Sequence, residues 1–497
     1  MQANVIPGVP VRMQQDGWWL DDPVDPIGRR HAVRRRDSGK VLLLLALIAL
    51  GDVLVWDAAP GINLALFAGV VLMAGLGLAW PRLSARTRFA IAAGGVLSLL
   101  PLVDLVQPLS VLIALVGLSL CMAAVAGLSR ADVLRGAARL WWVAPVQSVS
   151  DGAGCVRRVG EVSLARSDMR NIALAWVVPV AASVLFAVLI LAANPVLDRW
   201  VADVLAFDIS GPGWGRVWFW GVLSAAIWPA LVTYRMRERL RARKPVRMTV
   251  RRPGLVNAGS VARSLVAFNL LFAVQTGMDV LFLYGDATLP EGISPATYAH
   301  RGAYPLLATA LLAGLFAVVA QPFLAGKPML RGLMLLWLAQ TLALVVASMW
   351  RLDLYIDAFG LTRLRIAAHI WMWLVAIGLG LVVWQIWKDK PTSWMMLRSG
   401  ALGAAALYAC AFYSFDGRVA AHNLSVKDAP DLALLCRSSE DVIPAMAAVY
   451  GPSWRAACVS FYDTPEVFEP ADWREWGFRN WRTRNSLRAM TTEAAVP

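Results

Sequence analysis

The stretch that decides the fold is VLLLLALIALGDVLVWDAAPGINLALFAGVVLMAGLGLAW, residues 41–80. It holds two nearly unbroken apolar runs, and each is close to the roughly 20 residues that a helix needs to cross a bilayer. Lipid offers the backbone no hydrogen-bond partner, so a run that crosses it folds as a helix. The letters DAAPGIN between the runs are typical of a turn. The stretch therefore predicts a hairpin of two membrane-spanning helices.

The same pattern continues along the chain. Hydrophobic residues make up 58% of the sequence and charged residues 16%, whereas soluble domains average roughly 45–50% and about 25%. This composition excludes an ordinary water-soluble enzyme and a disordered chain. We predict an all-α, polytopic transmembrane helix bundle of about eleven spans, with a small helical extracytoplasmic C-terminal domain. The candidate spans are 41–58, 62–80, 89–106, 109–128, 171–193, 214–233, 262–284, 303–325, 330–350, 368–387 and 399–415.

Basic residues give the net charge of +14, and they concentrate in alternate connections. Examples are RRHAVRRR (29–36) and RMRERLRARKPVRMTVRR (235–252). By the positive-inside rule, this bias predicts a cytoplasmic amino terminus and, with an odd number of spans, an extracytoplasmic carboxyl terminus. The expected location is the cell inner (plasma) membrane. The expected partners are the lipid bilayer, anionic lipid headgroups at the basic cytoplasmic loops, and a membrane or envelope protein, but no nucleic acid.

Composition divides the chain into seven segments. The predicted order is a basic cytoplasmic tail (1–40), four transmembrane helices (41–128), a cytoplasmic loop with an interfacial helix (129–170), two transmembrane helices (171–233), a basic cytoplasmic loop (234–261), five transmembrane helices (262–415) and the extracytoplasmic C-terminal domain (416–497).

Two of the five cysteines, Cys436 and Cys458, lie in the C-terminal segment. Disulfides persist outside the cytoplasm. A disulfide between these two residues is one hypothesis, and two separate buried thiols are the alternative.

A polar cluster is predicted at the outer face. The loop RLDLYIDAFGLTRLR (351–365) is short but rich in charge, and YAHRGAY (298–304) precedes a span. Three arginines on the outer side run against the positive-inside rule. They could form a salt-bridge cluster with Asp353 and Asp357, or a site for an anion or a lipid headgroup, since arginine binds phosphate and carboxylate in a bidentate manner. YAHRGAY could equally be a simple interfacial anchor. The candidate residues are Arg351, Asp353, Tyr355, Asp357, Arg363, Arg365, His369, Tyr298, His300 and Arg301.

Three acids, Asp52, Asp104 and Asp279, lie in or near apolar runs. A charge within hydrocarbon usually faces a bundle interior or a wet cavity. Each acid could pair with an arginine from an outer loop and line a pocket, or could reach the headgroups from an ordinary helix end. The four histidines have no compact metal-binding spacing. We therefore predict no catalytic residue, no metal site and no cofactor.

Five ordered blocks carry a resemblance to a known family. They are YAHRGAYPLLATALLAGL (298–315), RLDLYIDAFGLTRLR (351–365), VAAHNL (419–424), SEDVIPAM (439–446) and DWREWGFRNWR (472–482). Together they resemble a bacterial multi-pass membrane family known only as domain of unknown function four-one-seven-three, with four-one-five-three as a close relative. Phe359 and Gly477 depart from its usual Tyr and Asn. The resemblance covers roughly 260–485 and implies an architecture and a location, but no reaction.

Three functional hypotheses follow. The first is a non-enzymatic sensor, scaffold or partner subunit of the cell envelope, which the absence of catalytic motifs favours. The second is a transporter or flippase for an anionic or lipid substrate, which the buried acids and the arginine-rich loop favour. The third is a membrane-embedded enzyme on lipid-linked substrates, with Asp, His and Arg near the outer face.

Overall fold

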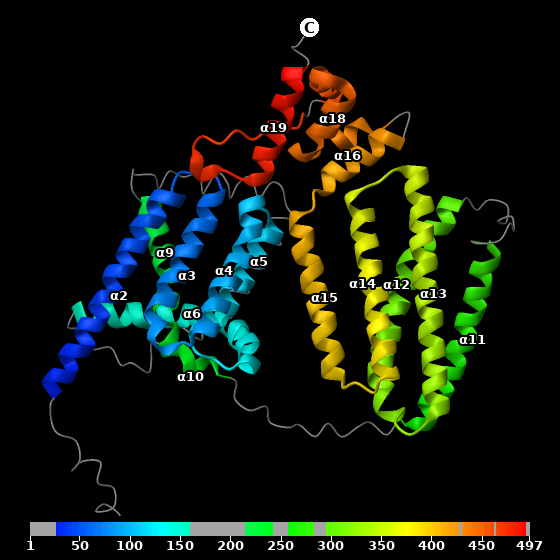
Figure 1. Ribbon diagram of the computed structural model, residues 1–497, viewed down its shortest axis with the longest axis horizontal. Helices are drawn as coiled ribbons and strands as arrows, with labels where there is room; N and C mark the ends of the chain where they lie inside the picture. Colours follow the sequence, from blue (N-terminus) through cyan, green and yellow to red (C-terminus); the bar gives the residue numbers. More distant parts are fainter. Residues whose placement is uncertain are drawn as a thin grey trace, which may run out of the picture. The chain divides into compact units, whose positions relative to one another are not determined.

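The computed structural model describes residues 26–159, 214–241, 257–282, 295–426, 430–461 and 464–493. Within these ranges the secondary structure is helical and contains no strand (Figure 1), which confirms the all-α prediction. The chain divides into two compact units. Unit 1 comprises Met1–Ala58, Leu66–Gly95 and Leu118–Ala242, and unit 2 comprises Ala59–Ala65, Val96–Gly117 and Arg243–Pro497.

Eight helices in the described ranges are long and apolar enough to cross a membrane. They correspond to eight of the eleven predicted spans. Of the other three, 171–193 lies outside the described residues and 41–58 lies mostly in α2 (Pro26–Val55). The third, 303–325, lies in α12 (Pro295–Ala320) and η4 (Gln321–Phe323), where the described apolar helix is Ala308–Phe323. The eight candidates are Ile62–Arg82, Ala85–Asp104, Pro108–Val125, Trp214–Leu240, Ala258–Leu281, Pro328–Phe359, Arg363–Trp387 and Thr392–Phe412.

Unit 1 packs around small and aliphatic side chains. Leu72 and Leu76 are buried against Met122 and Ala230. A Cβ on Gly51 would lie 2.4 Å from a terminal methyl carbon of Leu223, so a larger residue there would require the Leu223 side chain to move. The helices of this unit are α2, α3 (Ile62–Ala79), η2 (Trp80–Arg82), the first half of α4 (Ala85–Asp104), the end of α5 (Pro108–Val125), α6 (Arg130–Val159), α9 (Trp214–Val232), η3 (Thr233–Met236) and α10 (Arg237–Leu240).

Helix α6 covers the segment that the sequence assigns to an interfacial helix. Figure 1 shows part of α6 running across the other helices of unit 1 instead of alongside them. Trp141 and Trp142 are exposed on it. An exposed pair of tryptophans on such a helix fits the headgroup region of a bilayer, and its position there stays a prediction.

Unit 2 is built on five helices, which stand side by side in Figure 1. Trp337 lies at the centre of their core, with its ring 5.1 Å from Phe268, 5.8 Å from Phe272 and 5.4 Å from Phe316. This aromatic packing joins the first three helices of the group. The five helices are α11 (Ala258–Phe282), α12, α13 (Pro328–Phe359), α14 (Arg363–Trp387) and α15 (Thr392–Phe412).

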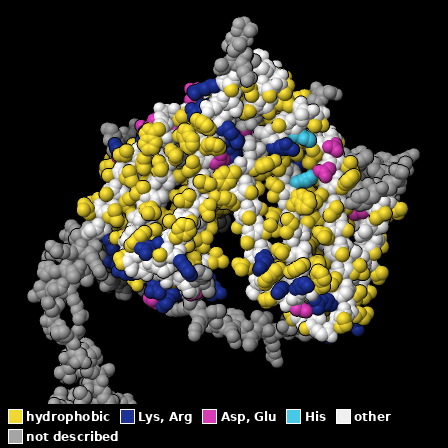
Figure 2. Space-filling view, in the orientation of Figure 1, with side chains coloured by type: hydrophobic (Ala, Val, Ile, Leu, Met, Phe, Trp, Pro, Cys, Tyr) yellow, Lys and Arg dark blue, Asp and Glu magenta, His cyan; other side chains and the backbone are white. Residues whose placement is uncertain are grey.

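Apolar side chains cover most of the visible faces of the span helices in Figure 2. In unit 2, basic side chains gather at one end of the spans, where the connections hold Lys327, Lys388 and Lys390 and the first turn of α13 holds Arg331. This separation of apolar faces and basic ends is typical of membrane helices.

The C-terminal cap, residues Phe415–Glu493, covers the ends of α13 and α14 that lie away from these basic residues. Its buried residues, including Val419, Leu435 and Met446, form one hydrophobic cluster with Ile356 and Ile366 of those two helices. The cap therefore shares a hydrophobic core with these two candidate membrane helices. Its helices are α16 (Phe415–Val426), α17 (Leu432–Cys436), η5 (Glu440–Val442), α18 (Ile443–Tyr450), η6 (Gly451–Phe461), η7 (Trp473–Glu475) and α19 (Phe478–Glu493).

A short turn links α13 to α14 beneath the cap. Gly360 ends α13 with a φ of 81°, a conformation that suits glycine. Thr362 begins α14, and its side chain accepts a hydrogen bond from the Arg365 amide at 3.4 Å. The Asn423 side chain of α16 binds this turn on both sides, because it accepts the Leu361 N–H at 2.7 Å and donates to the Leu361 carbonyl at 3.0 Å.

Candidate functional site beneath the C-terminal cap

The sequence suggests that 351–365 is a loop, but the structure places it at the end of α13 and the beginning of α14, with only residues 360–362 between the two helices. Its arginines do not form the predicted salt-bridge cluster with Asp353 and Asp357. Arg351 of α13 is 2% exposed and forms an ion pair with Asp279 of α11, which is also buried. Residues two positions apart point to different sides of a helix. Arg351 therefore faces α11, whereas Asp353 and Asp357 are exposed.

The other loop residues also have separate partners. Arg363 forms a bidentate ion pair with Asp416 of the cap. Arg365 donates to the Gly360 carbonyl, and its guanidinium lies 4.4 Å from the centre of the Tyr355 ring. The structure thus divides the predicted cluster, and two of its arginines stabilise helix contacts.

His369 and Asp353 lie close together, although the buried Nε2 atom of His369 makes no hydrogen bond with any described residue. The His369 Nε2 atom lies 3.0 Å from Oδ1 of Asp353, whose side chain is 62% exposed. The segment with Tyr298, His300 and Arg301 forms the beginning of α12, but these three side chains lie outside the part of the molecule that the structure describes.

Each of the three predicted intramembrane acids contacts an arginine. Asp279 also accepts a hydrogen bond from Gln275 at 3.0 Å, beside its contact with Arg351. In unit 1, Asp52 accepts hydrogen bonds from Arg216 at 2.8 Å and from the Trp220 indole at 2.9 Å.

Asp104 has its partner in the cap. Arg479 of α19 is 3% exposed and donates to Oδ2 of Asp104 through Nη2 at 2.6 Å and through Nε at 3.1 Å. Its Nη1 lies 3.2 Å from Asp441, which also accepts the Ser414 hydroxyl at 2.7 Å. Its Nη2 donates to the Ala411 carbonyl at 3.1 Å. One buried arginine therefore joins the end of α4, the end of α15 and η5.

A second buried acid fixes the beginning of the cap. Besides the Arg363 guanidinium, Asp416 accepts the Ser439 hydroxyl at 2.5 Å and the Ser439 amide at 3.1 Å. Burial raises the pKa of this carboxyl, but the hydrogen bonds from Arg363 and Ser439 outweigh it and hold the pKa below its ordinary value. Asp416 is therefore ionised at neutral pH and holds Arg363 and Ser439 together.

Glu475 ties the cap to the connection Ala59–Ala65. Its Oε1 accepts the Ala59 amide at 2.9 Å and its Oε2 accepts the Ala471 amide at 2.7 Å. A Cβ on Gly61 would lie 2.4 Å from the Glu475 backbone, so the close approach requires glycine at that position. Asn63 closes the connection, because its Oδ1 accepts the Gly61 amide at 2.8 Å.

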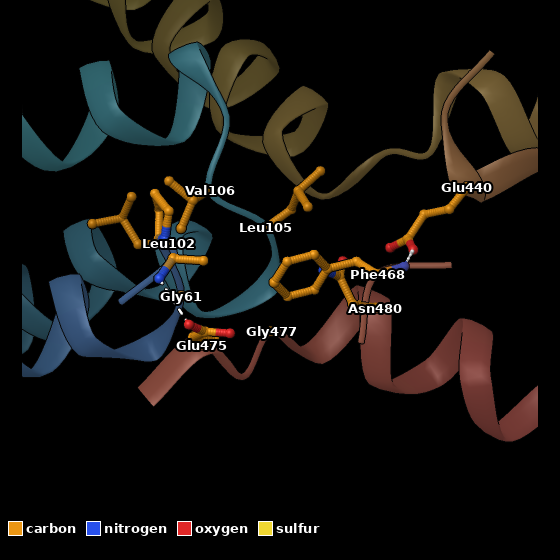
Figure 3. Close-up of a pocket in the computed structure, with 11 residues that line it drawn as sticks. Gly61, Leu102, Leu105, Val106, Glu440, Phe468, Glu475, Gly477 and Asn480 are labelled. Carbon is orange, nitrogen blue, oxygen red and sulfur yellow. Dashed lines mark hydrogen bonds between the residues drawn. The ribbon is translucent and has the colours of Figure 1, made fainter. Parts of the chain in front are cut away.

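A cavity of about 210 Å³ lies among these contacts. Figure 3 shows Leu102 and Val106 from the end of α4 and the loop after it, with Glu475 and Gly477 of the cap across from them. The other lining residues are Ala59, Pro60, Gly61, Leu105, Glu440, Phe468 and Asn480.

Besides Glu475, two polar side chains give the cavity its chemistry. Glu440 accepts the Phe468 amide at 2.7 Å (Figure 3). Burial raises the pKa of Glu440, and the negative charge of Asp441 raises it further. The Phe468 hydrogen bond and the positive charge of Arg484 lower it, but the net shift of the pKa is upward. The side-chain oxygen of Asn480 is buried and accepts no hydrogen bond from the described residues. The cavity therefore offers acceptors to a ligand that donates hydrogen bonds.

A disulfide cross-links two helices of the cap. Cys436 at the end of α17 is joined to Cys458 of η6, and both are buried. The sequence allows either this disulfide or two separate buried thiols, and the structure contains the disulfide. Among the described residues, no group of three or more His, Cys, Asp or Glu could hold a metal ion.

Sequence reasoning missed the cap residues that complete the site, namely Arg479, Asp416, Asp441, Asn423 and Glu475. Four of the five lie in the blocks VAAHNL, SEDVIPAM and DWREWGFRNWR, so the resemblance marked their neighbourhood without assigning them partners.

Comparison with known proteins gives one match. Residues 91–449 match the family model described as Domain of unknown function (DUF4153). No curated protein and no solved structure matches the chain. The matching family is the relative named in the resemblance above, and the matched residues include 351–365 and the cap as far as residue 449. Because the match covers more than two thirds of its residues, the chain belongs to the DUF4153 family.

Proposed function

We propose that this protein is a non-enzymatic integral membrane protein of the cell envelope, which acts as a sensor, scaffold or partner subunit through its C-terminal cap. The observation that carries the proposal is the attachment of the cap. Two charged clusters hold it on the ends of the span helices: one around the buried Arg479, and one that pairs the buried Asp416 with Arg363, whose side chain is 62% exposed. Breaking the buried Arg479 pair costs about 3–5 kcal/mol. These charged contacts therefore hold the cap in one position. A surface that docks a partner protein needs such a fixed position.

The proposed orientation places the cap on the extracytoplasmic side of the inner (plasma) membrane and the amino terminus in the cytoplasm. The basic connections at the opposite ends of the unit 2 spans support this orientation, and they would contact anionic headgroups. The Cys436–Cys458 disulfide supports it independently, since disulfides persist outside the cytoplasm. A topology reporter fused after residue 497 should be active only outside the cytoplasm. Activity of a cytoplasmic reporter at that position would show that the cap faces the cytoplasm and that the proposed orientation is wrong.

The partner is expected to contact apolar side chains on the cap. Val449 and Val459 are exposed there although they are aliphatic. A photo-crosslinking residue at Val459 in the native membrane should give a discrete protein adduct, and Val449→Asp should remove it. The matched control is a crosslinker at Leu397, an exposed residue of α15. Equal adducts from both positions, or no dependence on Val449, would count against a partner role for the cap.

A transporter or flippase for an anionic or lipid substrate is the second candidate. It is favoured by the Asp279–Arg351 pair, which is buried between two span helices. Along the same two helices, Oδ1 of Asn269 and Nε1 of Trp337 are buried and have no hydrogen-bond partner among the described residues. Asp279→Asn should then abolish movement of a fluorescent anionic lipid between the leaflets of proteoliposomes, whereas Asp353→Asn should not. Equal movement with and without the protein would remove this candidate.

A membrane-embedded enzyme on lipid-linked substrates is the third candidate, and the Asp353–His369 contact favours it. A histidine close to a carboxylate can act as a general base. If alanine at both positions leaves the cellular phenotype of the wild type intact, this candidate is excluded.

A further inference from the structure

The cavity under the cap combines an apolar wall with an acidic end. Leu102, Leu105 and Val106 line it together with the Phe468 side chain, and the Glu440 carboxylate and the Asn480 amide supply its polar groups. We propose that this cavity binds a primary ammonium group on a short apolar chain, with the ammonium at Glu440 and Asn480 and the chain along Leu102 and Phe468. The inference goes beyond the proposed function, because an amine would bind whether or not the cap docks a partner protein.

The charged groups around the cavity favour a positively charged ligand. Glu440 and Glu475 both line it, and the carboxylate oxygens of Glu475 already accept two backbone amides. Nearby, Arg479 is held between Asp104 and Asp441, and Arg484 acts on Glu440. The four carboxylates Glu440, Glu475, Asp104 and Asp441 therefore outnumber the two guanidinium groups. An anionic ligand would therefore meet repulsion from the walls.

The hydrogen-bonding groups of the cavity favour a ligand that donates hydrogen bonds. A carboxylate accepts through both oxygens, whereas an ammonium has three donors and no acceptor. Glu440 uses one oxygen for the Phe468 amide, and the Asn480 oxygen accepts nothing from the described residues. Burial keeps the pKa of Glu440 above its ordinary value, so a nearby positive charge would favour its ionised form.

The size and position of the cavity limit the ligand further. A volume of about 210 Å³ corresponds to about seven water molecules at the ~30 Å³ that each occupies in the liquid. This is room for a small alkylamine or for the ethanolamine end of a phospholipid headgroup. Both sources fit, because Leu102 lies near the end of a helix that is long and apolar enough to cross a membrane.

Calorimetric titration of the full chain with n-butylamine tests the proposal, in nanodiscs of phosphatidylcholine alone. Butanol, which has the same chain but no charge, is the control ligand. We expect saturable heat with butylamine and none with butanol. Glu440→Gln should weaken butylamine binding at least about tenfold, since hydrogen bonds to charged groups are the strong ones. The matched control Glu469→Gln, at an exposed carboxylate next to Phe468, should bind as the wild type does.

A second variant keeps the test decisive if Glu440→Gln perturbs the cap. Val106→Trp places a large side chain from a half-buried loop position into the cavity and should abolish binding. Nanodiscs that contain phosphatidylethanolamine separate the two sources. Loss of butylamine binding there identifies the lipid headgroup as the natural occupant, and unchanged binding identifies a free amine. Equal heats for butylamine and butanol, or full binding by Glu440→Gln and Val106→Trp, would overturn the proposal without affecting the crosslinking test of a partner at Val459.

Discussion

Replacement of Arg479 by methionine tests how the cap is held. The side chain is 3% exposed and lies 2.6 Å from Asp104 and 3.2 Å from Asp441. Methionine leaves both carboxylates buried without their counter-charge, and breaking such a pair costs about 3–5 kcal/mol. At about 1.4 kcal/mol for each factor of ten, the population with an open cap should rise about 100-fold to 4,000-fold.

Hydrogen–deuterium exchange of the full chain in nanodiscs measures that population, because amides exchange from locally open states. Exchange should accelerate in α19 and around Asp441, and stay unchanged in the core around Trp337. The matched control is Arg482→Met, an exposed arginine on the same helix. Neutralising Asp104 and Asp441 as Asn in the Arg479→Met background should restore part of the protection, since no buried charge then remains. If Arg479→Met exchanges no faster than Arg482→Met, the buried arginine does not hold the cap and the reasoning is wrong.

Three further predictions concern the rest of the cap. Asn423→Ala removes both hydrogen bonds to the Leu361 backbone, and it should destabilise the protein by about 1–3 kcal/mol in thermal unfolding; an unchanged unfolding temperature would contradict this. Replacing Cys436 and Cys458 by alanine opens a loop with a sequence separation of 22 and should destabilise the cap by about 3 kcal/mol. In wild-type protein taken from the native membrane, both thiols should resist alkylation until a reductant is added, and labelling before reduction would show that no disulfide exists there. The lowered pKa of Asp416 contributes stability that is fully present above 3.8, the ordinary pKa of an aspartate side chain, and it is lost as the pH falls through the lower folded pKa. Cap protection should therefore stay constant down to about pH 4 and fall below it, and Asp416→Asn should flatten this dependence; an identical pH profile in the variant would exclude the role of this carboxyl.

The helices could be predicted from the sequence because their signal is local. An apolar run such as VLLLLALIAL (41–50) specifies a helix through its own residues. Gly360 likewise marks the end of α13, since only its own φ matters there. The exact number of spans depends on segments such as 171–193, which lie outside the described residues.

The partners of the charged residues could not be predicted in the same way. The sequence singled out Asp104 as an acid that needs a partner, but nothing local indicates that the partner is Arg479 in a C-terminal helix. In the 351–365 loop, closeness in sequence suggested that Arg351 would meet Asp353, and helix geometry places them on different sides. Such pairings depend on tertiary packing, and a single sequence carries no record of it.

The Asp104–Arg479 contact also has a consequence for biosynthesis. The two residues are 375 positions apart in the chain, and at about 5–20 residues per second the ribosome needs about 20 to 75 s to make the residues between them. During this interval the α4 carboxylate has been inserted while its counter-ion does not yet exist. A nascent chain that stalls before residue 479 therefore displays an uncompensated acid at a helix end, where a membrane protease or chaperone can distinguish it from the finished protein.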